Sequence, residues 1–150
     1  MSIFDKALTH ISVAIQKLVG SNRLKPYEEA CLTAWVGAIS SEAGGALKRQ
    51  LNSFDYIERG PQGMVSAFHS LSDPDYKAWE NFLFKRKDSG LKVFQGILLS
   101  NIGDLAYESG FSIYIHQGRL STIEFKSPPK QLMKCEGEIQ VKKTRCLVQL

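Results

Sequence analysis

The sequence predicts an α+β domain in which N-terminal helices pack on a mostly antiparallel sheet, with a short helix between strands. Two patterns lead to this class. Apolar residues recur at helical spacing over the first third of the chain, and they then fall into short, turn-bounded segments with the alternating spacing of strands. The length of 150 residues is that of one ordinary domain. We therefore expect a single globular domain, helical over residues 1–52 and sheet-rich over residues 53–150.

Two N-terminal helices are predicted. The first covers residues 2–19, where apolar side chains keep to the i, i+3, i+4, i+7 pattern and Gly20 follows as a natural stop. The second begins at Pro26, because proline suits the first helical position and Glu28 and Glu29 suit the positive end of the helix dipole. The pair Gly44–Gly45 weakens its middle, but residues 46–51 could continue the helix. Its predicted buried stripe consists of Ala30, Cys31, Ala34, Trp35, Ala38 and Ile39.

In the middle of the chain the residue pattern predicts a hairpin followed by a short helix. Segments 54–58 and 64–71 flank a Gly-Pro-Gln-Gly turn at residues 60–63, so we expect them to pair as antiparallel strands. Aromatic residues at helical spacing then predict a short helix near residues 74–86.

Two further strands carry irregularities that the sequence reveals. Segment 91–100 is apolar on both faces, which predicts an interior strand, and Gly96 within it predicts close approach by a neighbour. In the C-terminal strand, Ile139 and Val141 occupy odd positions, whereas the apolar residues after residue 145 occupy even ones. In a regular strand the two sets would therefore lie on opposite faces. A bulge or tight turn near residues 143–144 would reconcile the two parities.

The hairpin over residues 111–125 permits a prediction of register. A two-residue loop, Gln117–Gly118, would place the apolar residues of its two strands on opposite faces, whereas a three-residue loop from His116 to Gly118 unites them and makes Gly118 left-handed. We therefore predict the three-residue loop. The predicted buried face carries Phe111, Ile113, Ile115, Ile123 and Phe125. The opposite face carries Ser112, Tyr114, Leu120, Thr122 and Glu124.

The sequence contains no recognisable metal or cofactor signature. Its three histidines are scattered, and its three cysteines lack the paired spacing of a zinc site. An odd number of cysteines leaves at least one thiol unpaired, which favours a reducing compartment. With neither a signal-peptide core nor a run of about 20 apolar residues, the chain is expected to be cytoplasmic and not membrane-bound.

One group of residues contains the types used in nucleophilic catalysis. His69 lies between Ser66, Ser70 and Asp73, a set that could supply a base, a nucleophile and an orienting acid. Alternation along the strand, however, places His69 on the face opposite to both serines. We therefore favour a hydrogen-bonded core or edge histidine and predict no catalytic residue, while an enzyme whose site forms only in the fold, around His69 or Cys31, remains an alternative.

The basic character of the chain is concentrated at its C-terminus. Residues 1–125 hold 13 basic and 13 acidic side chains, whereas residues 126–150 hold six basic and two acidic ones, which accounts for the net charge of +4. A dedicated nucleic-acid module would carry a basic stripe over its main body. A solvated strand face is therefore the favoured interpretation, and a nucleic-acid-associated accessory protein that uses this segment is the alternative.

One stretch resembles a known group of proteins. Gly118, Arg119 and Leu120, followed by Ile123-Glu124-Phe125 and then by Pro128-Pro129, are similar to a segment of small bacterial immunity proteins, which neutralise polymorphic or contact-dependent growth inhibition toxins. Residues 49–51, which run into segment 54–59, are similar to that group in layout. The explicit match covers roughly a dozen residues.

The resemblance implies a cytoplasmic, non-enzymatic inhibitor that needs no cofactor. It would bind a cognate protein toxin and block the active site or substrate access. In or beside the similar segment, Tyr114 could supply apolar area with a polar tip, Arg119 a planar fork of donors and Glu124 a charged acceptor. These three residues are the predicted partner-binding site. Their alternatives are a helix-covered tyrosine, a solvated loop arginine and a cross-strand glutamate pair.

Overall fold

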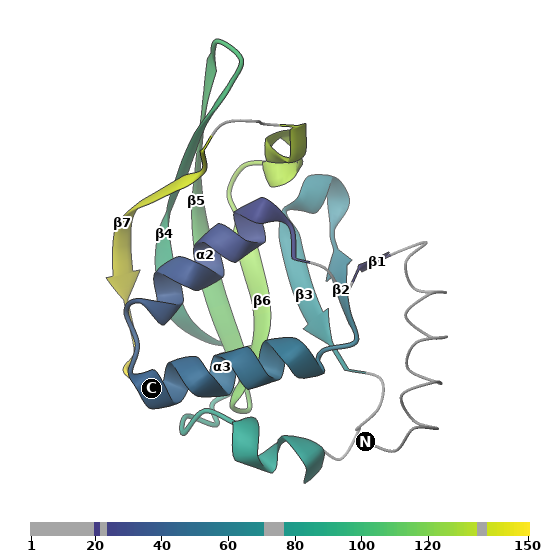
Figure 1. The fold of residues 1–150 in the computed structure, drawn as a ribbon, viewed down its shortest axis with the longest axis vertical. Helices are drawn as coiled ribbons and strands as arrows, with labels where there is room; N and C mark the ends of the chain where they lie inside the picture. The colour runs from purple at the N-terminus through teal and green to yellow at the C-terminus, as the bar shows by residue number, and fades with distance from the viewer. Residues whose placement is uncertain (1–19, 22–23, 71–76, 135–137) are drawn as a thin grey trace.

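The structure, a computed structural model, describes residues 20–21, 24–70, 77–134 and 138–150. Within these residues two helices lie on one face of a seven-stranded antiparallel sheet of order β1-β2-β3-β6-β5-β4-β7 (Figure 1). The predicted α+β class is confirmed, and the helix predicted over residues 2–19 lies outside the described residues. The strands are β1 (Gly20–Ser21), β2 (Tyr56–Arg59), β3 (Val65–His69), β4 (Leu91–Ile102), β5 (Leu105–His116), β6 (Arg119–Phe125) and β7 (Gln140–Cys146).

The helices are α2 (Pro26–Val36) and α3 (Ser41–Ser53), so the helix that begins at Pro26 does not continue to residue 51, and a separate helix covers that segment. The break falls at residues 37–40 because Ser40 takes an extended conformation and its hydroxyl accepts a hydrogen bond from the Ala43 N–H at 3.2 Å. This N-cap starts a new helix ahead of the glycine pair that the sequence marks as weak. Of the predicted stripe, Cys31 and Trp35 are fully buried, and Ala38 is exposed.

The described residues also form three 3-10 turns: η1 (Pro61–Gly63), η2 (Lys77–Phe82) and η3 (Pro129–Lys134). The first forms the predicted turn between β2 and β3. The second replaces the helix predicted near residues 74–86 and is tighter and shorter than expected. Gln50 of α3 holds η2 and the β5–β6 hairpin together, since its buried amide donates to the Phe82 and Gly118 carbonyls and accepts from the Leu120 N–H.

The β5–β6 hairpin confirms the predicted buried face but not the predicted loop. Ile115 pairs with Leu120, which leaves the two-residue loop Gln117–Gly118, where both residues have positive φ (51° and 82°). Ser121 is then an extra, bulged residue, and beyond it Ile113 pairs with Ile123. Because the bulge shifts the alternation by one residue, the two apolar sets share a face despite the short loop, and Leu120 is buried with them rather than on the opposite face.

The irregularities predicted for the other strands are confirmed. Gly96 allows close approach by Phe111, since a Cβ at this position would lie 2.9 Å from the phenyl ring. Opposite it, Lys143 and Thr144 form a bulge in β7, with Lys143 at φ 52°. β4 is an interior strand as predicted, between β5 and β7. Only one of its faces is fully buried by the described residues, and the side chains on its other face are half-buried.

Candidate functional site

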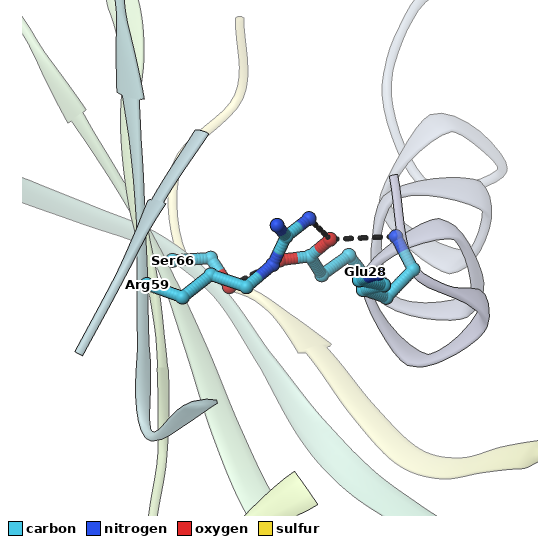
Figure 2. Close-up of polar contacts among 4 residues, drawn as sticks. Glu28, Arg59 and Ser66 are labelled. Carbon is cyan, nitrogen blue, oxygen red and sulfur yellow. Dashed lines mark hydrogen bonds and ion pairs between the residues drawn. The ribbon is translucent and has the colours of Figure 1, made fainter. Parts of the chain in front are cut away.

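A buried polar cluster joins α2 to the β2–β3 hairpin. The carboxylate of Glu28, in the first turn of α2, accepts two hydrogen bonds from Arg59 at the end of β2, Nε to Oε2 at 2.9 Å and Nη2 to Oε1 at 2.6 Å (Figure 2). The Ser66 hydroxyl of β3 donates to Oε2, and the Lys25 backbone N–H donates to Oε1 at 2.7 Å. The Glu28 and Ser66 side chains are inaccessible to solvent.

The geometry of this cluster supports a structural role. Each oxygen of Glu28 accepts two hydrogen bonds, so the carboxylate is fully occupied by the protein's own donors. The neighbouring Tyr27 is also buried, and burial, followed by the negative charge of Glu28, raises the pKa of its hydroxyl to about 12. Such a closed network fixes α2 against the sheet and offers no free group for a substrate.

The catalytic set considered around His69 is not assembled by the described residues. Ser66 faces the core, where it binds Glu28, and His69 lies on the other face, as strand alternation predicted. There the imidazole stacks on Tyr56, with ring centroids 4.9 Å apart, and its Nε2 lies 3.4 Å from the Glu58 carboxylate. Asp73 lies outside the described residues.

The sheet face opposite the helices, which we call the open face, is a candidate binding surface. Buried and half-buried residues alternate along β5 and β6, and the helices cover only the buried side (Figure 1). One row on the open face crosses four strands. From β3 to β4 it contains Ala67, Thr122, Tyr114 and Lys92. These side chains are half-buried by their neighbours in the sheet and by no described helix.

Two of the three predicted partner-binding residues meet on the open face. Glu124 is exposed and pairs across the strands with Ser112, next to half-buried Tyr114. Desolvation, followed by the charge of Glu124, raises the pKa of Tyr114. The aromatic ring, the hydroxyl and the carboxylate therefore lie side by side on the open face.

Arg119 lies elsewhere. Its guanidinium stacks on the buried ring of Trp79 at 3.9 Å and lies 5.6 Å from the ring of Phe54. These contacts give Arg119 a packing role at the start of β6, over η2, and separate it from Tyr114 and Glu124. The contact between Arg119 and Trp79 of η2 could not be inferred from spacing along the sequence.

A second feature, which the sequence did not indicate, adjoins the open face. Residues 100–107 form a two-stranded arm, because β7 pairs with β4 no further than Leu99 and β6 pairs with β5 no further than Phe111 (Figure 1). Leu105 at the tip is 73% exposed. Between residues 100 and 110 the chain carries Asp104 and Glu108 and no basic residue.

The described residues provide limited means for other chemistry. They contain no group of three or more His, Cys, Asp or Glu side chains that could hold a metal ion. Cys31 and Cys146 carry free thiols, and burial raises the pKa of Cys31, while Cys135 lies outside the described residues. None of the helices in the described part of the chain is long and apolar enough to cross a membrane.

Comparisons with protein-family models, curated proteins and solved structures found no match to this chain. Function must therefore be argued from the surfaces themselves, because a fold alone does not determine it.

Proposed function

We propose that this protein is an immunity-type inhibitor, which binds a cognate bacterial toxin domain and blocks its active site or substrate access without catalysing a reaction. The observation that carries the proposal is the open face, a broad sheet surface that no described helix covers. A stable protein complex needs about 800 Å² from each partner, and a sheet face offers its side chains on an ordered backbone, which lowers the entropic cost of binding.

Within the open face, Tyr114 and Glu124 are the proposed anchors. Tyrosine provides apolar area together with a polar tip and is enriched among the residues that dominate binding energy. Glu124 lies close enough to the Tyr114 hydroxyl to raise its pKa, so the polar tip and the carboxylate form one small polar patch. A partner with a donor opposite Glu124 would thus meet a prearranged acceptor.

The charge of the chain departs from that of nuclease immunity proteins, which are often acidic, because its net charge is +4. Exposed acidic groups are local: Asp104, Glu108 and Glu124 lie on β4–β6 and their turn, with Lys92 beside Tyr114. The basic excess at the C-terminus includes Lys142, Lys143 and Arg145 in β7, which is the outermost strand of the described sheet. Lysines and a bulge at a sheet edge discourage unwanted strand pairing, so these cations have an explanation other than nucleic-acid binding.

The proposal is tested by co-expressing the chain with the product of the gene directly upstream, where the toxin gene of an immunity protein is expected. We expect protection of the cells and co-purification of the two proteins. Tyr114→Ala and Glu124→Ala should each weaken the complex by at least about fivefold, the loss of one binding anchor, without changing the circular dichroism spectrum.

Lys48→Ala, on the exposed side of α3, is the matched control and should bind like the wild type. If the wild-type chain neither protects nor co-purifies, the inhibitor function is wrong. Should folded Tyr114 and Glu124 variants bind at full strength, the open face around them is not the contact.

A further inference from the structure

An apolar groove lies between α2 and the start of β7. Its apolar lining comes from Ala30 and Ala34 of α2 and from Ile139 and Val141, all of them half-buried. The groove has a volume of about 490 Å³ and is open to solvent, with exposed Glu29 at its rim. It lies on the helix side of the sheet, because Val141 pairs with the buried Leu98.

The edge of the sheet beside this groove is open. In the described part of the sheet β7 has one neighbour, β4, so its other side presents backbone donors and acceptors (Figure 1). Lys142 and Arg145 point to the open face, because they pair with Ile97 and Gln95 of β4. Both are exposed, and neither takes part in an ion pair among the described residues.

We propose that β7 and the α2–β7 groove form a docking site for an extended protein segment in which acidic and apolar residues alternate. The segment adds to β7 as a further strand. Side chains of a strand alternate between its two faces, so one set of side chains would face Lys142 and Arg145 and the other would enter the groove beside Val141. The first set must be acidic and the second apolar. This surface differs from the Tyr114 region, and the inference does not rest on the inhibitor function.

The charges of β7 select for such a partner. A neutral or basic strand that pairs with β7 would leave Lys142 and Arg145 unpaired or facing like charge, whereas opposite charges on neighbouring strands stabilise the pairing. The same lysines that prevent indiscriminate pairing therefore admit an acidic segment. The bulge at Lys143 and Thr144 interrupts the edge, so pairing is expected mainly around Gln140, Val141 and Lys142, next to the groove.

The test uses the full chain and two synthetic peptides of about seven residues, the length of an ordinary strand. One alternates Glu and Val, and the other alternates Lys and Val. In amide NMR spectra we expect the Glu–Val peptide to shift the signals of β7 and of the α2 residues that line the groove, Ala30 and Ala34. The Kd should be about 1 mM or tighter. The Lys–Val peptide should produce no such shifts.

Variants separate the two parts of the site. Lys142→Glu should weaken binding of the Glu–Val peptide by at least about threefold, and the double variant K142E/R145E should bind the Lys–Val peptide instead. Ala34→Gln, which fills the groove without adding charge, should also weaken binding. Lys48→Glu on α3 makes the same charge change away from β7 and should have no effect.

Three results would overturn the inference. They are the absence of shifts with the Glu–Val peptide at several millimolar, shifts located away from β7 and α2, and equal binding of both peptides to the wild type. Because the experiment contains no toxin, it can fail while the inhibitor proposal stands, and the reverse also holds.

Discussion

At the scale of single residues, Glu28 shows what a sequence reveals and what it withholds. Its position in the first turn of α2 indicated a favourable interaction with the helix dipole. Its complete burial depends on Arg59 and Ser66, which are 31 and 38 residues away along the chain. A local pattern cannot contain such partners, since the hairpin that brings them to α2 forms only in the fold.

Glu28→Gln should destabilise the protein strongly. The substitution removes the carboxylate charge that pairs with the Arg59 guanidinium, which is only 15% exposed, and breaking a buried ion pair in this way costs about 3 kcal/mol or more. Denaturant unfolding measures the change. Glu29→Gln, in the same helical turn but exposed, is the control and should lie within about 0.5 kcal/mol of the wild type. Equal effects of the two substitutions would contradict the structural role of the cluster.

Tyr27 predicts an alkaline limit to stability. Its pKa is about 12 in the folded protein, above the ordinary value of 10.0, so the folded state holds the hydroxyl proton more tightly than the unfolded state. The contribution of Tyr27 is therefore complete below pH 10 and is lost as the pH rises towards 12. Unfolding free energies measured across this range should fall with pH, and less steeply in Tyr27→Phe. A slope unchanged by Tyr27→Phe would exclude this residue as a cause.

At the scale of elements, alternation predicted faces better than it predicted loops. The buried faces of β5 and β6 follow directly from the period of two, and the parity change in the C-terminal segment indicated its bulge. In the β5–β6 hairpin the parity argument considered loop length alone and favoured the longer loop, whereas the protein keeps the two-residue loop and restores the alternation with a bulge at Ser121. Only the pairing of the two strands distinguishes these solutions.

Gly118→Ala tests the tight loop that results. Gly118 has φ 82°, and a Cβ there would lie 3.1 Å from the Phe84 carbonyl oxygen, so the substitution adds a steric conflict to backbone strain. We expect a loss of about 1 kcal/mol or more in the free energy of unfolding. Gly90→Ala is the matched control, because Gly90 also has positive φ (60°) but nothing within 4 Å of the added Cβ. If Gly118→Ala cost no more than Gly90→Ala, close packing around the loop would be refuted.

At the scale of the whole molecule, the described fold is a sheet covered by helices on one face only. The sequence predicted the helices and most strands, because both have strong periods. It predicted a contact patch of Tyr114, Arg119 and Glu124, of which the fold unites two and places the third on Trp79. It could not predict the arm, whose exposure follows from where β6 and β7 stop pairing with their neighbours.

The arm permits a last prediction, which rests on the inhibitor proposal. A two-stranded ribbon with exposed Leu105 and Asp104 at its tip and exposed Glu108 next to its base is suited to entering a basic cleft, where the leucine loses its contact with water and the carboxylates meet cations. Leu105→Ser should leave the free energy of unfolding within about 0.5 kcal/mol of the wild type, since the side chain is 73% exposed.

The same variant should weaken inhibition of the toxin by at least about fivefold, and Asp104→Asn should slow association most at low salt. Titration of toxin activity with purified variants measures both effects, with Lys48→Ser as the control. A Leu105→Ser protein that is folded and inhibits like the wild type would exclude the arm from the contact. Inhibition would then have to come from the rest of the open face, where the Tyr114 and Glu124 variants report on it separately.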